Sequence, residues 1–244
     1  MIEDAVEIRT QDGVADSFFY HDGKRRPGVL FLTDIFGIRE ANRDMAQRLA
    51  EAGYAVLMPN IFYRAGKPPL FQSKPNFDDE QGRKRLAELS GPLTAEATQR
   101  DASAYVQFLK QNQFVRRGHI GVVGYCFTGA MALRTAAAFP GQIAAAASFH
   151  GGRLFVDGPN SPHHLLPEVE ARLYFGHAAD DRSMPADAIE RLNEALKRWG
   201  GKYESETYDG AHHGWTVPDS AAYNHPQAER AFEKLKELFF ATLT

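Results

Sequence analysis

The feature that most constrains the fold of this chain is the regular alternation of short apolar runs with longer segments of helical periodicity. The runs at 29–33, 55–58 and 143–149 are almost continuously apolar, which is typical of strands buried on both faces of a sheet. Between them, apolar residues recur every three or four positions, most clearly at 38–52 and 94–112, and this spacing predicts helices. Strands that alternate with helices form a mostly parallel sheet with helices packed on it, so the pattern predicts an α/β fold.

The N-terminal part of the chain departs from this alternation. Two strand-like segments, 6–10 and 14–20, flank the turn sequence Gln11-Asp12-Gly13, which predicts an antiparallel hairpin. No repeat or long linker interrupts the order that follows, so we expect one domain spanning residues 1–244. The same reasoning predicts further strands at 119–123, 172–175 and 203–208, and further helices at 79–89, 127–139, 185–199 and 222–243.

Composition and charge exclude several classes of protein. The 244 residues include one cysteine, Cys126, which excludes an internal disulfide framework and any site with several cysteine ligands. The 28 Lys and Arg residues are balanced by 31 Asp and Glu residues, so no basic surface for nucleic acid is indicated. No apolar run approaches the roughly 20 residues of a membrane-spanning helix. The acidic start Met1-Ile2-Glu3-Asp4 is unlike a secretion signal, so we expect a cytoplasmic protein without a membrane partner.

We expect neither a metal nor a cofactor. His163 and His164 are adjacent, so their rings point apart, and no third ligand lies at a metal-binding spacing. The glycine pairs Gly151-Gly152 and Gly200-Gly201 lack the pattern of a phosphate-binding or dinucleotide-binding loop. The chemistry is therefore expected to come from side chains alone.

The residues with the clearest chemical meaning are Gly124-Tyr125-Cys126-Phe127-Thr128-Gly129. They follow a predicted strand and open a predicted helix, which is the strand–turn–helix setting of a nucleophile elbow. Glycine two positions before the cysteine avoids a clash inside the turn, and the start of a helix favours a thiolate. Thr128 stands where the strict pattern has glycine. The alternative is a buried cysteine in a tight turn without a catalytic role.

A nucleophile needs a base, and the base needs an acid that orients it. In chains with a nucleophile elbow, the catalytic residues follow one another in the order nucleophile, acid, histidine. Asp180 and Asp181 follow one predicted strand, and His212 and His213 follow the next. Considered alone, Asp181 would be interpreted as a helix cap, and either histidine would be interpreted as an exposed loop residue. Because both pairs lie at carboxyl ends of strands, where open α/β sheets place their sites, together they predict a Cys–His–Asp triad.

These segments resemble the dienelactone hydrolase family, the α/β-hydrolases whose nucleophile is cysteine rather than serine. The resemblance implies the α/β-hydrolase fold, with a mostly parallel central sheet, helices on both faces and an antiparallel N-terminal hairpin. It rests on the elbow and on Thr33-Asp34-Ile35-Phe36-Gly37, Asp181-Arg182-Ser183-Met184-Pro185 and Ala211-His212-His213-Gly214-Trp215.

The resemblance also implies an activity. Members of the family hydrolyse a small ester or lactone through an acyl-enzyme, so a small-molecule substrate of this kind is expected. Cys126 would be the nucleophile, His213 the base and Asp181 the acid, while His212 and Asp180 stay open as alternatives. The backbone N–H groups of Ile35 and Phe127 would form the oxyanion hole.

Substrate-binding residues are implied in the same way. Asp34 stands where the family has a glutamate that interacts with the resting cysteine, and Arg83 is the nearest counterpart of an arginine that binds a substrate carboxylate. Tyr125 and Trp215 are expected to line the pocket. His150 ends a predicted strand on the same side of the sheet as the elbow, so it either lines the pocket or is a structural histidine with its hydrogen bonds satisfied. A second family arginine has no counterpart, because the stretch after the histidine reads Thr216-Val217-Pro218.

Three departures from the family pattern leave other functions open. The missing arginine favours a carboxylesterase or thioesterase that acts on another small acyl substrate. Thr128 and Asp34 leave room for a catalytically silent module that binds a ligand or senses redox state through Cys126. The loop-rich segments 60–92 and 151–168 are expected to cover the pocket in either case. Monomer and homodimer are equally compatible with the sequence.

Overall fold

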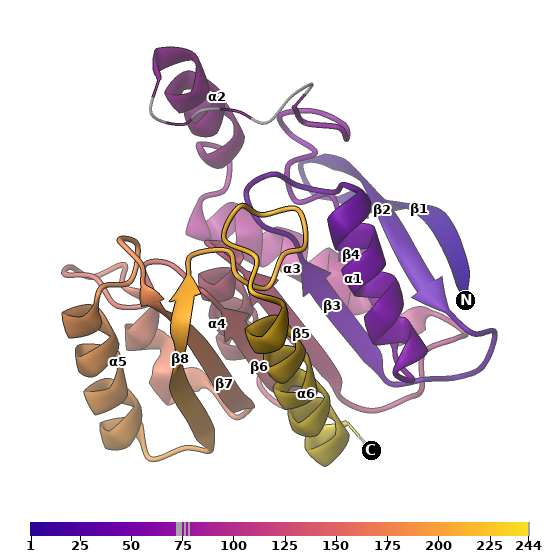
Figure 1. The fold of residues 1–244 in the computed structure, drawn as a ribbon. Helices are drawn as coiled ribbons and strands as arrows, with labels where there is room; N and C mark the ends of the chain where they lie inside the picture. The colour runs from indigo at the N-terminus through magenta and orange to yellow at the C-terminus, as the bar shows by residue number, and fades with distance from the viewer. Residues whose placement is uncertain (72–74, 76, 78, 244) are drawn as a thin grey trace.

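The computed structural model describes residues 1–71, 75, 77 and 79–243. An eight-stranded sheet forms its centre, in the order β1-β2-β4-β3-β5-β6-β7-β8 (Figure 1). The hairpin of β1 and β2 lies at one edge and pairs antiparallel with β4, whereas every pairing from β4 to β8 is parallel. The strands are β1 (Ile2–Thr10), β2 (Gly13–His21), β3 (Gly28–Leu32), β4 (Ala55–Pro59), β5 (Ile120–Tyr125), β6 (Ile143–Phe149), β7 (Arg172–Asp180) and β8 (Tyr203–His212).

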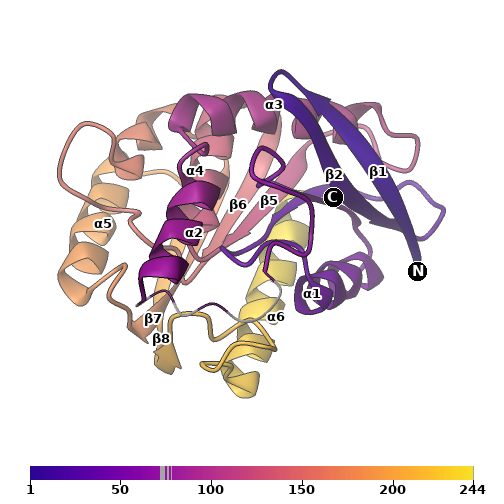
Figure 2. The same ribbon diagram turned by 90° about the horizontal axis from the view of Figure 1, so that it is seen from above.

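Helices cover both faces of the sheet, as Figure 2 shows from above. One face carries α1 (Glu40–Glu51) and α6 (His225–Thr242). The other carries α3 (Ala95–Gln111), α4 (Thr128–Ala138) and α5 (Ala186–Trp199). A further helix, α2 (Glu80–Ser90), stands above the carboxyl ends of the parallel strands (Figure 1), and a short 3₁₀ helix spans Pro162–Glu168. None of the described helices is long and apolar enough to cross a membrane.

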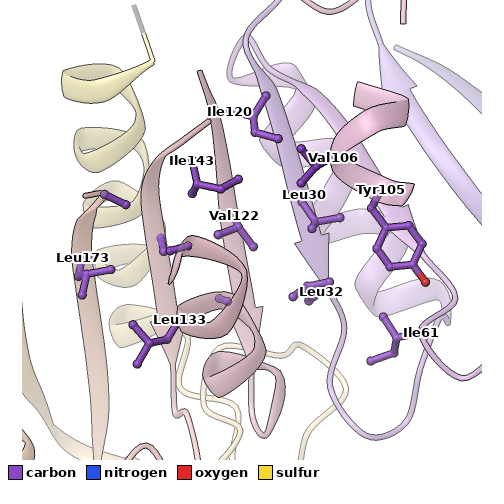
Figure 3. Packing of buried hydrophobic residues seen from close by; sticks show 14 of the residues in the cluster. Leu30, Leu32, Ile61, Tyr105, Val106, Ile120, Val122, Leu133, Ile143 and Leu173 are labelled. Atoms are coloured by element: carbon purple, nitrogen blue, oxygen red, sulfur yellow. The ribbon is translucent and has the colours of Figure 1, made fainter. Parts of the chain in front are cut away.

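The central strands are buried on both faces because successive side chains point to opposite sides of the sheet. Leu30 and Leu32 of β3 and Val122 of β5 pack with Tyr105 and Val106 of α3 on one face (Figure 3). The intervening residues of the same strands face the opposite core; Val29, Phe31 and Val123 pack there with Leu49 of α1 and Leu235 of α6. This double burial explains the continuous apolar runs, and the predicted α/β-hydrolase architecture is confirmed.

The boundaries of two elements differ from the sequence-based prediction in a way that matters for function. β7 and β8 continue past the predicted ends at 175 and 208, and their last paired residues are Asp180 and His212. The extensions mix buried residues such as Ala178 and Ala211 with polar, exposed ones and end on exposed Asp180 and His212, so no continuous apolar run marks them in the sequence. As a result Asp181 and His213, rather than their neighbours, are the first residues beyond the strands.

Candidate active site

Cys126 lies at the tip of the tight turn between β5 and α4. Its backbone has φ of +61°, in the left-handed region that side chains other than glycine rarely adopt. The turn tolerates no Cβ at Gly124, where one would lie 2.1 Å from the carbonyl oxygen of Thr128. A Cβ at Gly129 would lie 2.1 Å from Ser148 Oγ on β6. Both glycines are therefore required for the close approach of strand and helix, and the predicted strand–turn–helix elbow is present.

Thr128, which departs from the strict glycine pattern, holds this turn together. Its buried hydroxyl accepts the backbone N–H of Tyr125 at 2.8 Å. The same hydroxyl lies 2.8 Å from the carbonyl oxygen of Tyr125 and 3.2 Å from that of Leu32 on the neighbouring β3. Threonine thus ties the turn to the sheet by hydrogen bonds.

The three residues expected to form a triad lie together at the carboxyl ends of β5, β7 and β8. His213 Nε2 lies 3.0 Å from Cys126 Sγ, and His213 Nδ1 lies 2.6 Å from Asp181 Oδ2. Ser183 supports the carboxylate, because its backbone N–H and its hydroxyl donate to Asp181 Oδ1 at 2.8 and 2.6 Å. The arrangement is a continuous hydrogen-bonded chain from a thiol through an imidazole to a buried carboxylate.

The alternative pair lies elsewhere. Asp180 Oδ2 and His212 Nδ1 face one another at 3.4 Å, with side chains that are 78% and 63% exposed. They are opposite each other in the register of β7 and β8 and point into solvent. The geometry therefore brings Asp181 and His213, and not their neighbours, to the thiol.

The site stabilises charge on both His213 and Asp181. Burial opposes protonation of the imidazole, but the hydrogen bonds and charges of Asp181 and Cys126 outweigh burial and raise the pKa of His213 to about 10. Burial also opposes ionisation of Asp181, yet His213 and Ser183 outweigh it and hold the pKa of the carboxyl below its usual value. At neutral pH the arrangement thus favours a protonated His213 beside an ionised Asp181.

Two backbone N–H groups belong to residues near the cysteine: Phe127 follows Cys126 in the chain, and Ile35 lines the same cavity as Cys126. Within the described part of the chain, neither the N–H of Ile35 nor that of Phe127 donates to a protein acceptor. Phe127 precedes α4, and Ile35 lies in the loop between β3 and α1. Asp34 shapes this loop, because its Oδ1 accepts the N–H of Phe36 at 3.0 Å. Both N–H groups are thus available to a ligand in the cavity.

Asp34 also lines the active-site cavity, and its carboxylate pairs with Arg39. Both guanidinium Nη atoms donate to Asp34, at 2.7 and 2.9 Å. Among the described residues, the hydrogen-bond partner of the Cys126 thiol is His213. The residue at the family's glutamate position thus engages an arginine five positions along the chain.

His150, the residue after β6, supports the nucleophile from the other side. Its Nδ1 accepts the backbone N–H of Cys126 at 3.0 Å, and its Nε2 lies 2.8 Å from Thr216 Oγ1. Burial, helped by the neighbouring charge of His213, holds the pKa of His150 well below its usual range. The imidazole is therefore neutral and able to accept at Nδ1. His150 also lines the active-site cavity.

The active-site cavity has a volume of about 620 Å³. Cys126, His150 and His213 lie at its base, and the loop after β3 and the segment after His213 form two of its sides. The segment 60–92 contributes a third side through Pro69, Leu70, Phe71, Pro75 and Phe77. Most of the described lining is apolar, which is typical of a small-molecule site.

Other expected pocket residues lie away from this cavity. Tyr125 is buried between Phe31 and Phe149 on the α1 and α6 face of the sheet, and Trp215 is fully buried against His150 and Tyr208. Arg83 lies on α2 and is not among the described residues of the lining. Residues of 151–168 line a separate cavity, which Phe127 also lines.

Several residues of the site were not identified from the sequence. Ser183 had a weak local signal, because a serine two positions after an aspartate is typical of a turn that caps the carboxylate. Arg39 had no local sequence signal, because one of its partners, Asp219, lies 180 positions further along the chain. Phe71 and Phe77 lie in a loop without periodicity. Within the described part of the chain, no cluster of side chains suited to a metal is present.

Comparison with known proteins identifies the family. The family model for the dienelactone hydrolase family matches residues 16–243. A carboxymethylenebutenolidase from Rhodococcus opacus is 30% identical over 224 residues, covering 88% of this chain and 81% of its own. A protein from Synechocystis sp., provisionally given the same name, is 27% identical over 216 residues, with coverages of 87% and 85%.

The fold agrees with solved structures. A crystal structure of a Klebsiella pneumoniae protein, provisionally named a dienelactone hydrolase, superposes with a TM-score of 0.85 over 98% of each chain, at 22% identity. At that identity the likeness shows the fold alone. The family assignment follows from the match to the family model over nearly the whole chain and from the 30% identical relative. The chain belongs to the dienelactone hydrolase family and is a hydrolase of the dienelactone hydrolase type.

Proposed function

We propose that the protein hydrolyses small carboxylic esters or lactones through an acyl-enzyme on Cys126. The observation that carries this proposal is the chain of short contacts from Cys126 Sγ to His213 and from His213 to Asp181. A nucleophile, a base and an orienting acid within hydrogen-bond reach of one another are the signature of covalent catalysis. The names of the relatives point to the same class of substrate.

Acylation uses the thiolate and imidazolium directly. The sulfur attacks the carbonyl carbon, and the electron pair of the C=O bond moves to oxygen, to which the N–H groups of Ile35 and Phe127 donate hydrogen bonds. The intermediate collapses with loss of the ester C–O bond, and His213 Nε2 donates its proton to the departing oxygen. Cys126 then carries the acyl group as a thioester, and His213 is neutral.

Deacylation reverses these roles. Neutral His213 takes a proton from water, and the resulting hydroxide attacks the thioester carbonyl. The C–S bond breaks, the acid is released, and the thiolate and imidazolium are restored. Asp181 remains ionised throughout and holds the imidazole with Nε2 directed at the sulfur.

The test is turnover and acyl-enzyme trapping with the Cys126→Ala variant. We expect wild-type protein to hydrolyse p-nitrophenyl acetate and a dienelactone, and we expect the variant to lose roughly a thousandfold or more in kcat. Rapid-quench mass spectrometry of the wild type should show one acyl group on Cys126. Full activity of Cys126→Ala on both substrates would disprove the mechanism.

A second activity, hydrolysis of esters or thioesters without a substrate carboxylate, is favoured by one observation. The stretch 216–218 after His213 contains no arginine, and Arg83 is not among the described residues of the cavity. Comparing kcat/KM for a dienelactone with kcat/KM for neutral esters and thioesters separates the two activities. No turnover on any of them, together with ordinary iodoacetamide reactivity of Cys126, would instead indicate a silent binding or redox-sensing module.

A further inference from the structure

A second cavity, of about 450 Å³, lies along the first two turns of α4. Its described lining includes Phe127, Ala130, Met131 and Arg134. The last three stand three, four and seven positions after Phe127, so the four side chains share one face of the helix. Residues of 152–162, in the loop after β6, form another part of the lining.

This second cavity adjoins the proposed catalytic residues. Phe127 contributes its side chain to the cavity, and its backbone N–H is one of the two proposed donors to the oxyanion. Gly152 packs against Ser183, since a Cβ at Gly152 would lie 2.8 Å from Ser183 Oγ. Ser183 Oγ in turn lies 3.3 Å from His213 Nδ1. One side of the proposed triad therefore borders the second cavity.

Arg134 brings a partly buried positive charge to this helix face. Its Nη2 donates to the carbonyl oxygen of Asn160 at 2.6 Å. Burial lowers the pKa of Arg134, and the charge of Glu96 only partly opposes this effect. Within the described part of the chain, Arg134 forms no direct ion pair. Because a partly buried guanidinium stays protonated and is normally paired, the position is suited to an anion.

Arg153 supplies a second guanidinium to the same cavity. Its backbone is left-handed, with φ of +55°, and its N–H donates to the carbonyl oxygen of Ser183 at 2.8 Å. Among the described residues, the side chain of Arg153 has neither a hydrogen bond nor an ion pair. Asp157, which also lines the cavity, is 86% exposed and pairs with Arg191 at 2.7 Å. Two guanidiniums without a carboxylate partner provide the donors and the charge that bind an anion.

We propose that the enzyme acts on extended esters whose acyl chain enters the second cavity and ends in an anionic group, which Arg134 and Arg153 bind. The inference rests on the proposed ester hydrolase and names its substrate more closely. His213, the proposed proton donor to the departing alcohol, lines the active-site cavity, so the alcohol occupies that cavity. The acyl chain, on the other side of the carbonyl carbon, then runs along Ala130 and Met131.

The helix sets the length of this acyl chain. Arg134 follows Phe127 by seven residues, which is a rise of about 10 Å along the helix axis. An extended chain of roughly eight carbons spans this distance, whereas a small lactone is too short to reach both the thiol and Arg134. Neither arginine is Arg83 or falls in 216–218, so the site is distinct from the carboxylate site that the family resemblance implies.

A matched pair of esters tests the anionic end. The p-nitrophenyl monoester of suberic acid ends in a carboxylate, and its terminal carboxamide has the same length without the charge. We expect kcat/KM to favour the carboxylate by about tenfold or more. A ratio near one, or no turnover of either suberic ester while p-nitrophenyl acetate is hydrolysed, overturns the inference and leaves the hydrolase function intact. No turnover of any of the three esters overturns the hydrolase function and this inference with it.

Two variants locate the effect in the second cavity. Arg153→Gln removes the exposed guanidinium, and we expect it to lower the carboxylate preference by about three- to tenfold. Arg134→Gln tests the partly buried guanidinium in the same way. Arg25→Gln is the matched control, because Arg25 is exposed outside the described lining and the variant changes the net charge equally. An equal change in Arg25→Gln and Arg153→Gln would show that the selectivity reflects overall charge and would overturn the local assignment.

The length of the chain and the kind of anion are tested separately. The corresponding pair made from adipic acid is shorter, so its carboxylate should stop short of Arg134 and its preference should be at least about threefold smaller. The same preference in both pairs would place the anion elsewhere and overturn the assignment to Arg134 and Arg153. A terminal phosphonate in place of the suberic carboxylate compares the two anions that guanidiniums bind. A preference for either anion over the carboxamide supports the site.

Discussion

The Nδ1 atom of His150 accepts the backbone N–H of Cys126 across a distance of 3.0 Å. Because the neutral ring accepts at Nδ1, it donates at Nε2, and Thr216 Oγ1 lies 2.8 Å away to receive that hydrogen. Both linked residues have left-handed backbones, with φ of +61° at Cys126 and +41° at His150. The imidazole thus holds the strained backbone of the cysteine from the end of the neighbouring strand.

This contact predicts different effects of two substitutions at His150. His150→Asn keeps a side-chain acceptor near Nδ1 and tolerates the left-handed backbone, so most of the activity should remain. His150→Leu leaves the Cys126 N–H with only the carbonyl oxygen of Phe149 at 3.1 Å, removes the partner of Thr216 Oγ1 and strains the left-handed backbone. We expect it to cost about 1–3 kcal/mol of unfolding free energy and to lower kcat about tenfold or more. Urea denaturation and steady-state kinetics measure both quantities. Equal behaviour of the two variants would contradict the role of the hydrogen bond.

Adjacent residues provide matched controls for the proposed triad. His213→Asn and Asp181→Asn should each lower kcat/KM on p-nitrophenyl acetate by roughly a hundredfold to ten-thousandfold, because general acid–base catalysis is lost. His212→Asn and Asp180→Asn alter the exposed neighbouring pair and should leave kcat/KM within about twofold, as surface changes usually do. A large loss in His212→Asn, with His213→Asn unaffected, would reassign the base.

The hydrogen bonds of the Thr128 hydroxyl lead to a prediction about the position of Cys126 in the elbow. Thr128→Val keeps the shape of the side chain but leaves the N–H of Tyr125 without its acceptor, which typically costs about 1–3 kcal/mol. A displaced nucleophile should also lower kcat by about ten- to a hundredfold. Thr128→Ser keeps the hydroxyl and should retain kcat. If valine is tolerated as well as serine, the hydroxyl does not position Cys126.

The raised pKa of His213 gives the free energy of unfolding a defined pH dependence. The pKa is about 10 in the folded protein, against about 6.5 in an unfolded chain. Because the folded state binds this proton more tightly, its contribution is fully present below about pH 6.5 and is lost as the pH rises toward 10.

The stability difference between wild type and His213→Asn should therefore be largest near about pH 6 and should shrink as the pH rises. Urea denaturation in the presence of a reductant, repeated across this range, measures the difference. His212→Asn, at the exposed neighbouring histidine, serves as the matched control for the substitution itself. A difference that grows with pH would contradict the raised pKa of His213.

The amino-acid sequence by itself determined the fold class, the N-terminal hairpin and the turn at Cys126. These depend on local patterns: continuous apolar runs for strands buried on both faces, glycine beside a short turn, and glycines on both sides of a cysteine between strand and helix. The sequence also predicted that Cys126, an aspartate and a histidine lie close together, because parallel strands bring their carboxyl ends to one edge of the sheet.

Only the tertiary structure distinguished His213 from His212 and Asp181 from Asp180. The ends of β7 and β8 are polar and exposed, so no apolar pattern marks where the strands stop. Since successive residues of a strand point to opposite sides, a difference of one residue decides which side chain reaches the thiol. The contacts of Arg39 with Asp219 and of His150 with Cys126 join residues far apart in the chain, and such pairings arise only when the sheet assembles.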